Sequence, residues 1–324
     1  MKDSLLDVRD LSVHFKLPEG EMTAVDRVSF TVGQGEVLGI VGESGSGKSQ
    51  ILYALMGLLA SNGRAEGQAM LGGDDLLAMA PTALDRVRGA EMAMIFQDPM
   101  TSLNPYQRVG EQLAEGLIVH GGLGRKAAWA EAVRMLDRVR IPDAANRARR
   151  YPHEFSGGMR QRVMIAMALL VKPKLLLADE PTTALDVTVQ AQVIDLMAEL
   201  ARESGTSMVF VTHDLGVVAR ICDRVAVLYG GRIMEEAPAP ILFASPRHPY
   251  SQGLLHTTPR MAAPLTARLE TIPGTPRSGG AMLPGCPFAP RCTVKIAACE
   301  ITQPPLVTIT PNQRAACHLL EGAA

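Results

Sequence analysis

The feature that most constrains this chain is a glycine-rich loop at residues 42–49, which reads GESGSGKS. It matches the pattern G-x-x-x-x-G-K-[ST] and lies between a short apolar, β-rich run (36–41) and an apolar stretch of helical character (51–59). Glycines let backbone N–H groups close around phosphate oxygens, and the positive end of the following helix favours an anion. The sequence therefore predicts a strand, a phosphate-binding loop and a helix, in that order.

The same loop predicts which side chains would contact a nucleotide. Lys48 would reach the β- and γ-phosphates, and Ser49 would hold Mg²⁺. A chance GKS in an ordinary glycine-rich turn is the alternative, but the flanking strand and helix argue against it. The residues expected to surround the nucleotide here are Gly42, Ser44, Gly45, Ser46, Gly47, Lys48, Ser49 and Gln50.

A second candidate site follows the apolar run 175–178, which ends in two adjacent carboxylates, Asp179 and Glu180. Such a run is typical of a buried parallel strand, and ligands bind at the carboxyl ends of parallel strands. Asp179 would reach Mg²⁺, and Glu180 would orient or deprotonate an attacking water. A solvated acidic strand end is the alternative, but a Mg²⁺–nucleotide site needs such a carboxylate.

The segment 155–162, FSGGMRQR, completes a set of three motifs. A phosphate-binding loop, this segment and the acidic pair, in that order, resemble the ATP-binding cassette (ABC) family, whose signature loop reads LSGGQ. The resemblance implies that Ser156, Gly157 and Gly158 bind the γ-phosphate of a nucleotide held by an opposite subunit. Read alone, Ser156 would be an ordinary helix N-cap.

The resemblance assigns further site residues. Gln97 resembles the Q-loop glutamine, which senses Mg²⁺ and the water and links to a membrane partner. Asp186 resembles the D-loop, and read alone it would be a helix N-cap. His213 resembles the switch histidine on the γ-phosphate. Phe15 is the candidate for stacking on adenine, although a core phenylalanine of a strand fits that position nearly as well.

The family pattern is not matched at every position. Phe155 stands where the signature usually has Leu, Met159 where it has Gln, and Gln50 where Thr is frequent after the phosphate loop. None of these departures removes a phosphate or metal ligand, so hydrolysis is expected to survive. Lys48, Asp179, Glu180 and His213 are all present, which argues against a non-hydrolysing scaffold.

Alternating strands and helices predict an α/β fold with a parallel sheet. The resemblance implies the ABC nucleotide-binding domain, a P-loop NTPase with a RecA-like core and antiparallel β and helical subdomains. We assign residues 1–240 to this domain, with the helical subdomain at about 98–165. Prolines become frequent after residue 236, so residues 241–324 are predicted to form a small C-terminal extension with sparse regular structure.

Composition excludes several classes. The net charge of −1 argues against a nucleic-acid binder that works by bulk electrostatics. Charges interrupt the N-terminal segment, and the longest apolar stretch, 163–171, is far too short to span a membrane. We therefore expect a cytoplasmic chain that would act at a membrane only through a partner.

Four of the five cysteines lie in the C-terminal segment: Cys286, Cys292, Cys299 and Cys317. Four thiolates in a reducing compartment could bind Zn²⁺ or an iron–sulfur cluster, although the C-x₂-C pairs of most zinc fingers are absent. Their pattern resembles the C-terminal extension of peptide-transporter ATPases, where a [4Fe–4S] cluster can be bound. Four unpaired structural thiols are the alternative. Cys222 stands apart and is interpreted as a core thiol.

The runs 95–105, 155–169 and 248–255 resemble the D-type ATPase of dipeptide and oligopeptide importers. The resemblance implies a heterodimer with an F-type ATPase, beneath two permeases and a substrate-binding protein, at the cytoplasmic face of the membrane. Two cassettes would close head to tail around ATP and Mg²⁺, the metal being held by Ser49, Gln97 and Asp179. Related systems carry nickel, glutathione or sugars, so the solute stays open. A soluble ABC ATPase acting on DNA or ribosomes is the alternative class.

Overall fold

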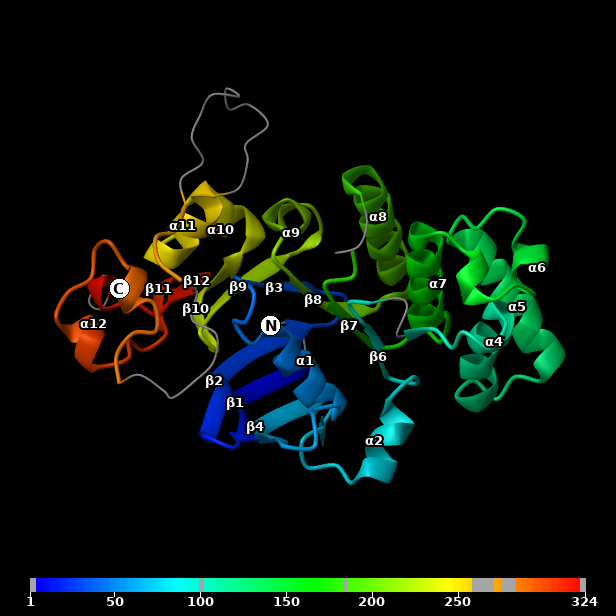
Figure 1. The fold of residues 1–324 in the computed structure, drawn as a ribbon, viewed down its shortest axis with the longest axis horizontal. Helices are drawn as coiled ribbons and strands as arrows, with labels where there is room; N and C mark the ends of the chain where they lie inside the picture. Colours follow the sequence, from blue (N-terminus) through cyan, green and yellow to red (C-terminus); the bar gives the residue numbers. More distant parts are fainter. Residues whose placement is uncertain (1–3, 99–101, 183–185, 258–270, 276–283, 321–324) are drawn as a thin grey trace. The chain divides into compact units, whose positions relative to one another are not determined.

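The computed structural model describes residues 4–98, 102–182, 186–257, 271–275 and 284–320 (Figure 1). The chain divides into two compact units. One comprises residues 1–5, 32–36 and 79–210, and the other comprises residues 6–31, 37–78 and 211–324.

The first unit combines a few neighbouring strands with a group of helices (Figure 1). Strands β8 (Ser207–Thr212), β7 (Leu175–Asp179) and β6 (Met92–Ile95) are neighbours in that order, and β6 and β7 run parallel. Its helices are α2 (Pro81–Val87), α4 (Val109–Val119), α5 (Arg125–Arg138), α6 (Ala144–Arg147), the 3₁₀ turn η1 (Pro152–Glu154), α7 (Gly157–Leu170) and α8 (Val187–Ser204).

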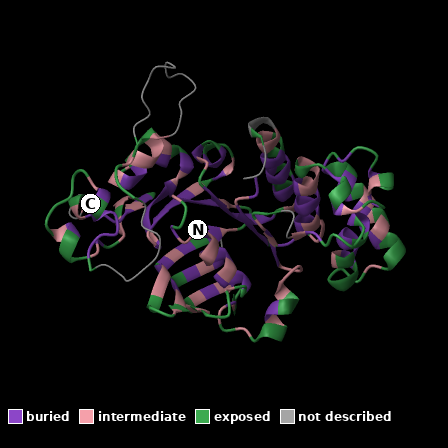
Figure 2. Ribbon diagram, viewed as in Figure 1, coloured by how far each residue is buried: buried purple, intermediate pink, exposed green. Residues whose placement is uncertain are grey.

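The core of this unit forms around β7 and α7. All five residues of β7 are buried, as expected for an apolar strand that is covered on both faces (Figure 2). Apolar residues occupy most sides of α7, which packs against α4, α5, α8 and β6. The predicted strand at 175–178 is therefore confirmed, and β7 is one residue longer.

The second unit contains two groups of strands. An antiparallel sheet has the order β2-β1-β4-β5, formed by β2 (Gly20–Gly33), β1 (Ser4–Leu17), β4 (Gly63–Leu71) and β5 (Asp74–Asp75). The turn between β1 and β2 contains Pro18 and Glu19. Helix α1 (Lys48–Met56) begins three residues before the predicted apolar stretch and includes the last two residues of the glycine-rich motif.

Five other strands of this unit are hydrogen-bonded neighbours in the order β11-β12-β10-β9-β3. Strands β3 (Val37–Val41) and β9 (Arg224–Tyr229) run parallel, and β10 (Arg232–Pro238), β12 (Gln313–Ala315) and β11 (Val307–Thr310) follow in antiparallel pairs. The remaining elements are α9 (Leu215–Ile221), α10 (Ala239–Ala244), α11 (Pro249–His256), α12 (Ala298–Ile301) and the 3₁₀ turns η2 (Ala289–Arg291) and η3 (His318–Leu320). Regular structure after residue 236 is thus less sparse than predicted.

Buried carboxylates join the C-terminal segment to β10. Glu235 has no exposed surface, and it accepts hydrogen bonds from the backbone N–H groups of Arg247 and His248 and from the Gln313 amide, at 2.8–2.9 Å. The neighbouring Glu236 is paired with Arg224 and Arg314. Burying a carboxylate is costly unless hydrogen bonds or a partner charge compensate it, and both carboxylates are compensated.

His248 is held neutral inside this segment. Burial lowers its pKa from 6.5 to about 4, and its Nδ1 accepts a hydrogen bond from the Tyr250 N–H at 3.0 Å. Because the unfolded histidine binds a proton more readily, the free energy of unfolding is expected to fall as pH drops from about 6.5 to about 4, by up to about 3 kcal/mol. Urea unfolding followed by circular dichroism across this range measures the slope.

His248→Asn isolates this effect, because an amide oxygen can replace the acceptor but does not titrate. The variant is expected to lose the part of the pH slope that belongs to His248, whereas His120→Asn, at an exposed histidine, should retain it. Equal slopes for the wild type and His248→Asn would contradict the assignment.

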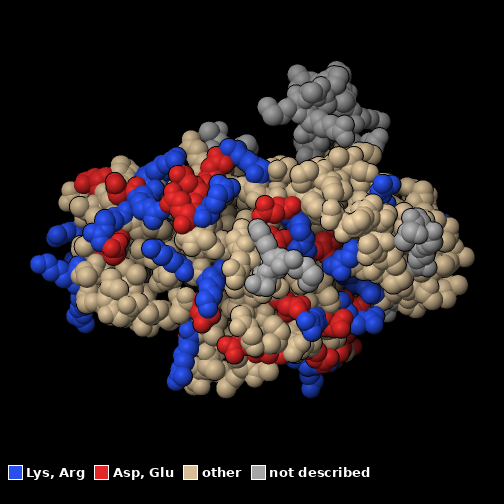
Figure 3. Space-filling model, turned by 180° about the vertical axis from the view of Figure 1, so that it is seen from behind, with Lys and Arg blue, Asp and Glu red and all other residues tan. Residues whose placement is uncertain are grey.

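Within the described residues, no helix combines the length and apolar character needed to cross a bilayer. On the face drawn in Figure 3, Lys and Arg side chains are intermixed with Asp and Glu. This distribution agrees with the near-zero net charge of the whole chain.

Candidate functional site

The glycine-rich loop lies between β3 and α1, as predicted. Lys48 is the first residue of α1 and is buried, and its Nζ donates hydrogen bonds to the backbone oxygens of Gly42, at 2.9 Å, and Glu43, at 3.0 Å. The ammonium group is thereby held across the loop. Ser49 and Gln50 follow in the first turn of α1 and are partly exposed.

The two outer glycines of the motif lie where no side chain fits. A Cβ on Gly42 would come within 2.1 Å of the Leu228 oxygen on β9, and a Cβ on Gly47 within 2.3 Å of the Ala24 oxygen on β2. Gly47 also has φ +99°, in the left-handed region that favours glycine. The absence of side chains lets the loop backbone pack closely against β9 and β2. The loop N–H groups then lie near the start of α1, where an anion is stabilised.

The loop fits a phosphate group by its donors as well. The Oγ atom of Ser46 is buried, and among the described residues it has no hydrogen-bond partner. A buried hydroxyl that lacks a partner is costly in a folded protein and is compensated when a ligand supplies the missing acceptor. Ser46, Lys48 and the backbone of the loop therefore form a donor set suited to phosphate oxygens. Ser44 and Gly45 are exposed at the rim of the loop.

The acidic pair lies at the carboxyl end of β7 in the first unit. Asp179 is the last residue of the strand and is fully buried, and Glu180 follows it and is partly exposed. Glu180 has φ +42°, which is uncommon for a residue with a side chain and costs about 1–2 kcal/mol. Strained backbone of this kind concentrates at functional sites.

Gln97 lies just after the neighbouring strand. Ile95 of β6 pairs with Ala178 of β7 in a parallel register, so Gln97 and the acidic pair leave the sheet at the same edge. Gln97 is exposed. This edge is where open α/β sheets bind ligands. Part of the run that follows, residues 99–101, lies outside the described residues.

The signature segment begins α7. Ser156 is the N-cap, and its Oγ accepts a hydrogen bond from the Met159 N–H at 3.4 Å. Ser156 and Gly157 are exposed, whereas Phe155 is buried beneath the guanidinium of Arg147, so it fills a core position. The helix start therefore presents exposed backbone N–H groups, and the departure at Phe155 does not affect them.

Gln161 is not among the predicted site residues, but it links this segment to the acidic pair. Its side-chain amide is buried and donates to the backbone oxygen of Pro181, directly after Glu180. Gly158 contributes to the same packing, because a Cβ there would lie 2.9 Å from Val189 of α8. Neighbouring residues in the sequence do not predict this contact of Gln161, because it depends on tertiary packing.

Three other predicted contacts involve Asp186, His213 and Phe15. Asp186 caps α8, with Oδ1 accepting from the Val189 N–H at 3.0 Å, so the N-cap interpretation holds. Ala184 and Leu185 of the predicted D-loop lie outside the described residues. His213 follows β8 and is exposed. Phe15 is half-buried in β1, with its ring against Gly63 of β4.

The predicted [4Fe–4S] site is not supported. The described part of the chain includes all four cysteines, yet it contains no group of three or more His, Cys, Asp or Glu side chains arranged to bind a metal. Burial raises the pKa of the Cys286 thiol to about 11 and also raises the pKa of Cys292. Cys222 is a buried thiol, as predicted.

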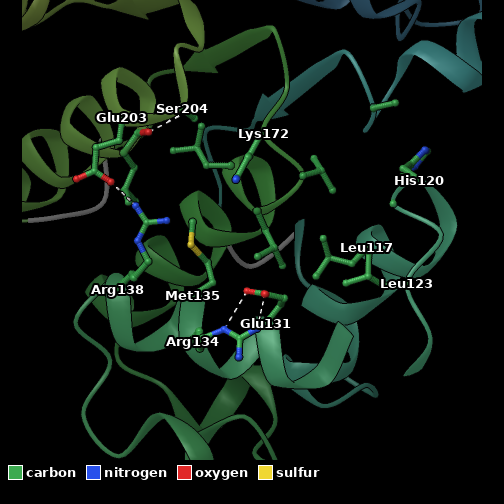
Figure 4. Close-up of a pocket in the computed structure, with 16 residues that line it drawn as sticks. Leu117, His120, Leu123, Glu131, Arg134, Met135, Arg138, Lys172, Glu203 and Ser204 are labelled. Carbon is green, nitrogen blue, oxygen red and sulfur yellow. Dashed lines mark hydrogen bonds and ion pairs between the residues drawn. The ribbon is translucent and has the colours of Figure 1, made fainter. Parts of the chain in front are cut away.

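A pocket of about 760 Å³ in the first unit lies away from these residues (Figure 4). It is lined by the ends of α4, α7 and α8 and by α5, where Arg134 pairs with Glu131 and Arg138 with Glu203. Ser156 stands at the opposite end of α7, about 20 Å along the helix. The pocket is therefore separate from the signature segment.

Two family comparisons agree with this arrangement. Residues 25–183 match the family described as ABC transporter, and residues 234–299 match the family described as oligopeptide/dipeptide transporter, C-terminal region. Among solved structures, the dimeric post-hydrolysis state of the ATP-binding cassette MJ0796 bound to ADP and Pi has a TM-score of 0.65 and is 27% identical, covering 72% of this chain and 98% of that chain. The structure of cbiO1 from Clostridium perfringens has a TM-score of 0.64 and is 26% identical, covering 75% of this chain and 92% of that one.

The curated relatives match over almost the full length. The oligopeptide transport ATP-binding protein OppD of Salmonella typhimurium is 56% identical over 313 residues, covering 97% of this chain and 93% of the relative. OppD of Escherichia coli is 55% identical over 315 residues, with the same coverage. The chain therefore belongs to the ABC transporter family of ATPases and carries the C-terminal region of its oligopeptide and dipeptide transporters.

Proposed function

We propose that this chain is the ATP-hydrolysing subunit of a peptide importer, and that it couples ATP binding and hydrolysis to uptake of dipeptides or oligopeptides. The observation that carries the proposal is the match to oligopeptide transport ATP-binding proteins over 97% of the chain. The loop with its buried Lys48 and Ser46, and the acidic pair after β7, support it at the level of chemistry.

In the proposed mechanism, a second cassette completes each nucleotide site. Lys48 and the loop N–H groups would bind the β- and γ-phosphates, and Ser49, Gln97 and Asp179 would hold Mg²⁺. Bound MgATP supplies the phosphoryl group and the metal charge. Further contacts come from His213 on the γ-phosphate, Phe15 on adenine, Asp186 across the dimer interface, and Ser156, Gly157 and Gly158 on the nucleotide of the opposite cassette.

Glu180 would direct the attacking water in line with the bond that breaks. Its carboxylate follows the buried strand β7, and its uncommon backbone conformation supports a functional role. Lys48 and His213 would stabilise the negative charge that develops on the γ-phosphate. Closing and reopening of two cassettes would then move the membrane partners.

We further propose the partners that the family implies. These are a related F-type ATPase as the second cassette, two permeases and an extracytoplasmic solute-binding protein, with this chain at the cytoplasmic face of the membrane. The described residues contain no candidate membrane span, so attachment through the permeases is the proposed route. Nucleic acid is not a proposed partner, and nickel, glutathione or a sugar are the alternative solutes.

Affinity purification of the tagged chain from detergent-solubilised membranes tests this proposal. Two multi-span permeases and a second cassette subunit are expected to copurify, and the accompanying binding protein can then be screened against peptides, nickel, glutathione and sugars. Recovery of ribosomal or chromosomal proteins without any membrane protein would overturn the transport role and favour a soluble ABC ATPase.

The [4Fe–4S] cluster stays a proposal that depends on the resemblance of the four cysteines alone. Iron, sulfide and zinc analysis of the same complex, purified without oxygen, tests it. About four iron and four sulfide per chain would support a cluster. Absence of both metals would leave the four residues as structural thiols.

A further inference from the structure

Arg291, in the C-terminal segment, is bound to the glycine-rich loop of the second unit. Its Nη1 donates to Oε2 of Glu43 at 2.5 Å, and its Nη2 donates to Oε1 at 3.1 Å. Two parallel bonds to one carboxylate form the bidentate geometry, which is stronger and more specific than a single contact. The Arg291 side chain is only 4% exposed, so this ion pair is screened much less than a surface pair.

The guanidinium of Arg291 is itself fixed by other contacts. Its Nε donates to the Pro273 oxygen at 2.9 Å, its Nη2 to the Ile272 oxygen at 3.3 Å, and its Nη1 to the Tyr229 hydroxyl at 3.3 Å. A guanidinium is charged at physiological pH, so Arg291 carries a full positive charge. Arg291 therefore presents a rigid positive charge to Glu43.

A second contact holds the backbone of Glu43. The Glu43 N–H donates to the hydroxyl of Tyr250 at 3.0 Å. Tyr250 is fully buried, and its ring packs against Tyr229 and Phe288, with centroid distances of 4.6 and 5.3 Å. The C-terminal segment thus fixes Glu43 through both its side chain and its main chain.

Glu43 occupies an unfavourable place for an acid. It directly follows Gly42, within the loop whose donors suit phosphate oxygens, and Lys48 donates to its backbone oxygen. An unpaired carboxylate at this position would repel a bound polyphosphate and would compete for Lys48. Pairing with Arg291 removes the net charge and keeps the carboxylate in one orientation.

We propose that Arg291 and Tyr250 are positioning residues for ATP binding, which neutralise Glu43 and hold the phosphate-binding loop in its binding conformation. This inference rests on the proposed role of the loop in binding ATP. It also gives the C-terminal segment a part in the nucleotide site, in addition to its packing on β9 and β10.

The test compares ATP binding and hydrolysis in the complete transporter. Arg291→Ala is expected to raise KM for ATP by about tenfold, with a smaller change in kcat, and Tyr250→Phe by about threefold. The second substitution Glu43→Gln, added to Arg291→Ala, is expected to restore most of the lost affinity because the repelling charge is gone. A purely structural role of Arg291 predicts no such restoration.

Two further variants serve as controls. Arg291→Lys retains the charge and is expected to keep KM within about threefold of wild type. Arg314→Ala removes another arginine of the C-terminal segment, which pairs with Glu236 rather than with the loop, and should leave KM for ATP unchanged. If Arg291→Ala does not assemble, Arg291→Gln removes the charge with less loss of packing and carries the same comparison with Glu43→Gln.

The proposal is overturned if Arg291→Ala binds ATP as the wild type does, or if adding Glu43→Gln restores nothing. Failure of the proposed function has a different signature. In that case the wild-type complex would not hydrolyse ATP, or Lys48→Ala would leave its hydrolysis intact.

Discussion

Replacing Glu180 with glutamine is expected to leave ATP binding intact and to slow ATP hydrolysis by about a thousandfold. An amide has nearly the same shape as the carboxylate but cannot accept a proton from the attacking water. Because Glu180 follows the buried strand β7, the substitution should not disturb the fold. Phosphate release by the assembled transporter measures hydrolysis, and retained nucleotide measures binding, with the cassettes expected to stay closed.

Glu203→Gln is the matched control, since Glu203 is an exposed glutamate of α8 in the same unit. It should hydrolyse ATP at the wild-type rate. Normal turnover by the Glu180→Gln transporter would refute the role assigned to Glu180.

The second large effect is expected from Gly47→Ala, which should weaken ATP binding by at least about a hundredfold. The added Cβ would lie 2.3 Å from the Ala24 oxygen, and the residue would have to adopt φ +99°. The loop must then move, and Lys48, the next residue, moves with it. Titration with a fluorescent ATP analogue measures the affinity, and the thermal midpoint reports on the fold.

Gly205→Ala separates backbone strain from steric exclusion. Gly205 ends α8 with φ +69°, but a Cβ there would meet nothing within 4 Å. This variant should lose about 1–2 kcal/mol of stability without a change in ATP affinity. If the two variants bound ATP equally well, close packing of the loop on β2 would not matter for binding.

Sequence patterns were sufficient to predict the local structure of segments whose conformation depends on neighbouring residues in the chain. The loop at 42–49, the apolar strand β7 with Asp179 and Glu180 after it, and the capped starts of α7 and α8 are all local signals. In each case the residue types favour one backbone conformation without help from distant contacts. These segments are also where the family resemblance is carried.

Sequence patterns did not predict features in which distant residues compensate for a locally unfavourable residue, such as a buried carboxylate. Strand β10 contains Glu235 and Glu236, which are 0% and 4% exposed, so hydropathy does not reveal a buried strand there. Their partners come from residues 224 and 247–248 and from β12. Arg291 likewise lies in a proline-rich segment, 248 positions from Glu43, and no spacing rule connects them.

The pairing of β12 with β10 protects an edge of the sheet from pairing with strands of other copies of the chain. Without β12, the outer N–H and C=O groups of β10 would be open to strands from other copies, a common starting point for aggregation. Glu235 and Glu236 face Ala315 and Arg314 in the register, so the C-terminal segment covers this row of backbone groups. The short β11, only four residues long, then forms the new outer strand and offers little backbone to another chain.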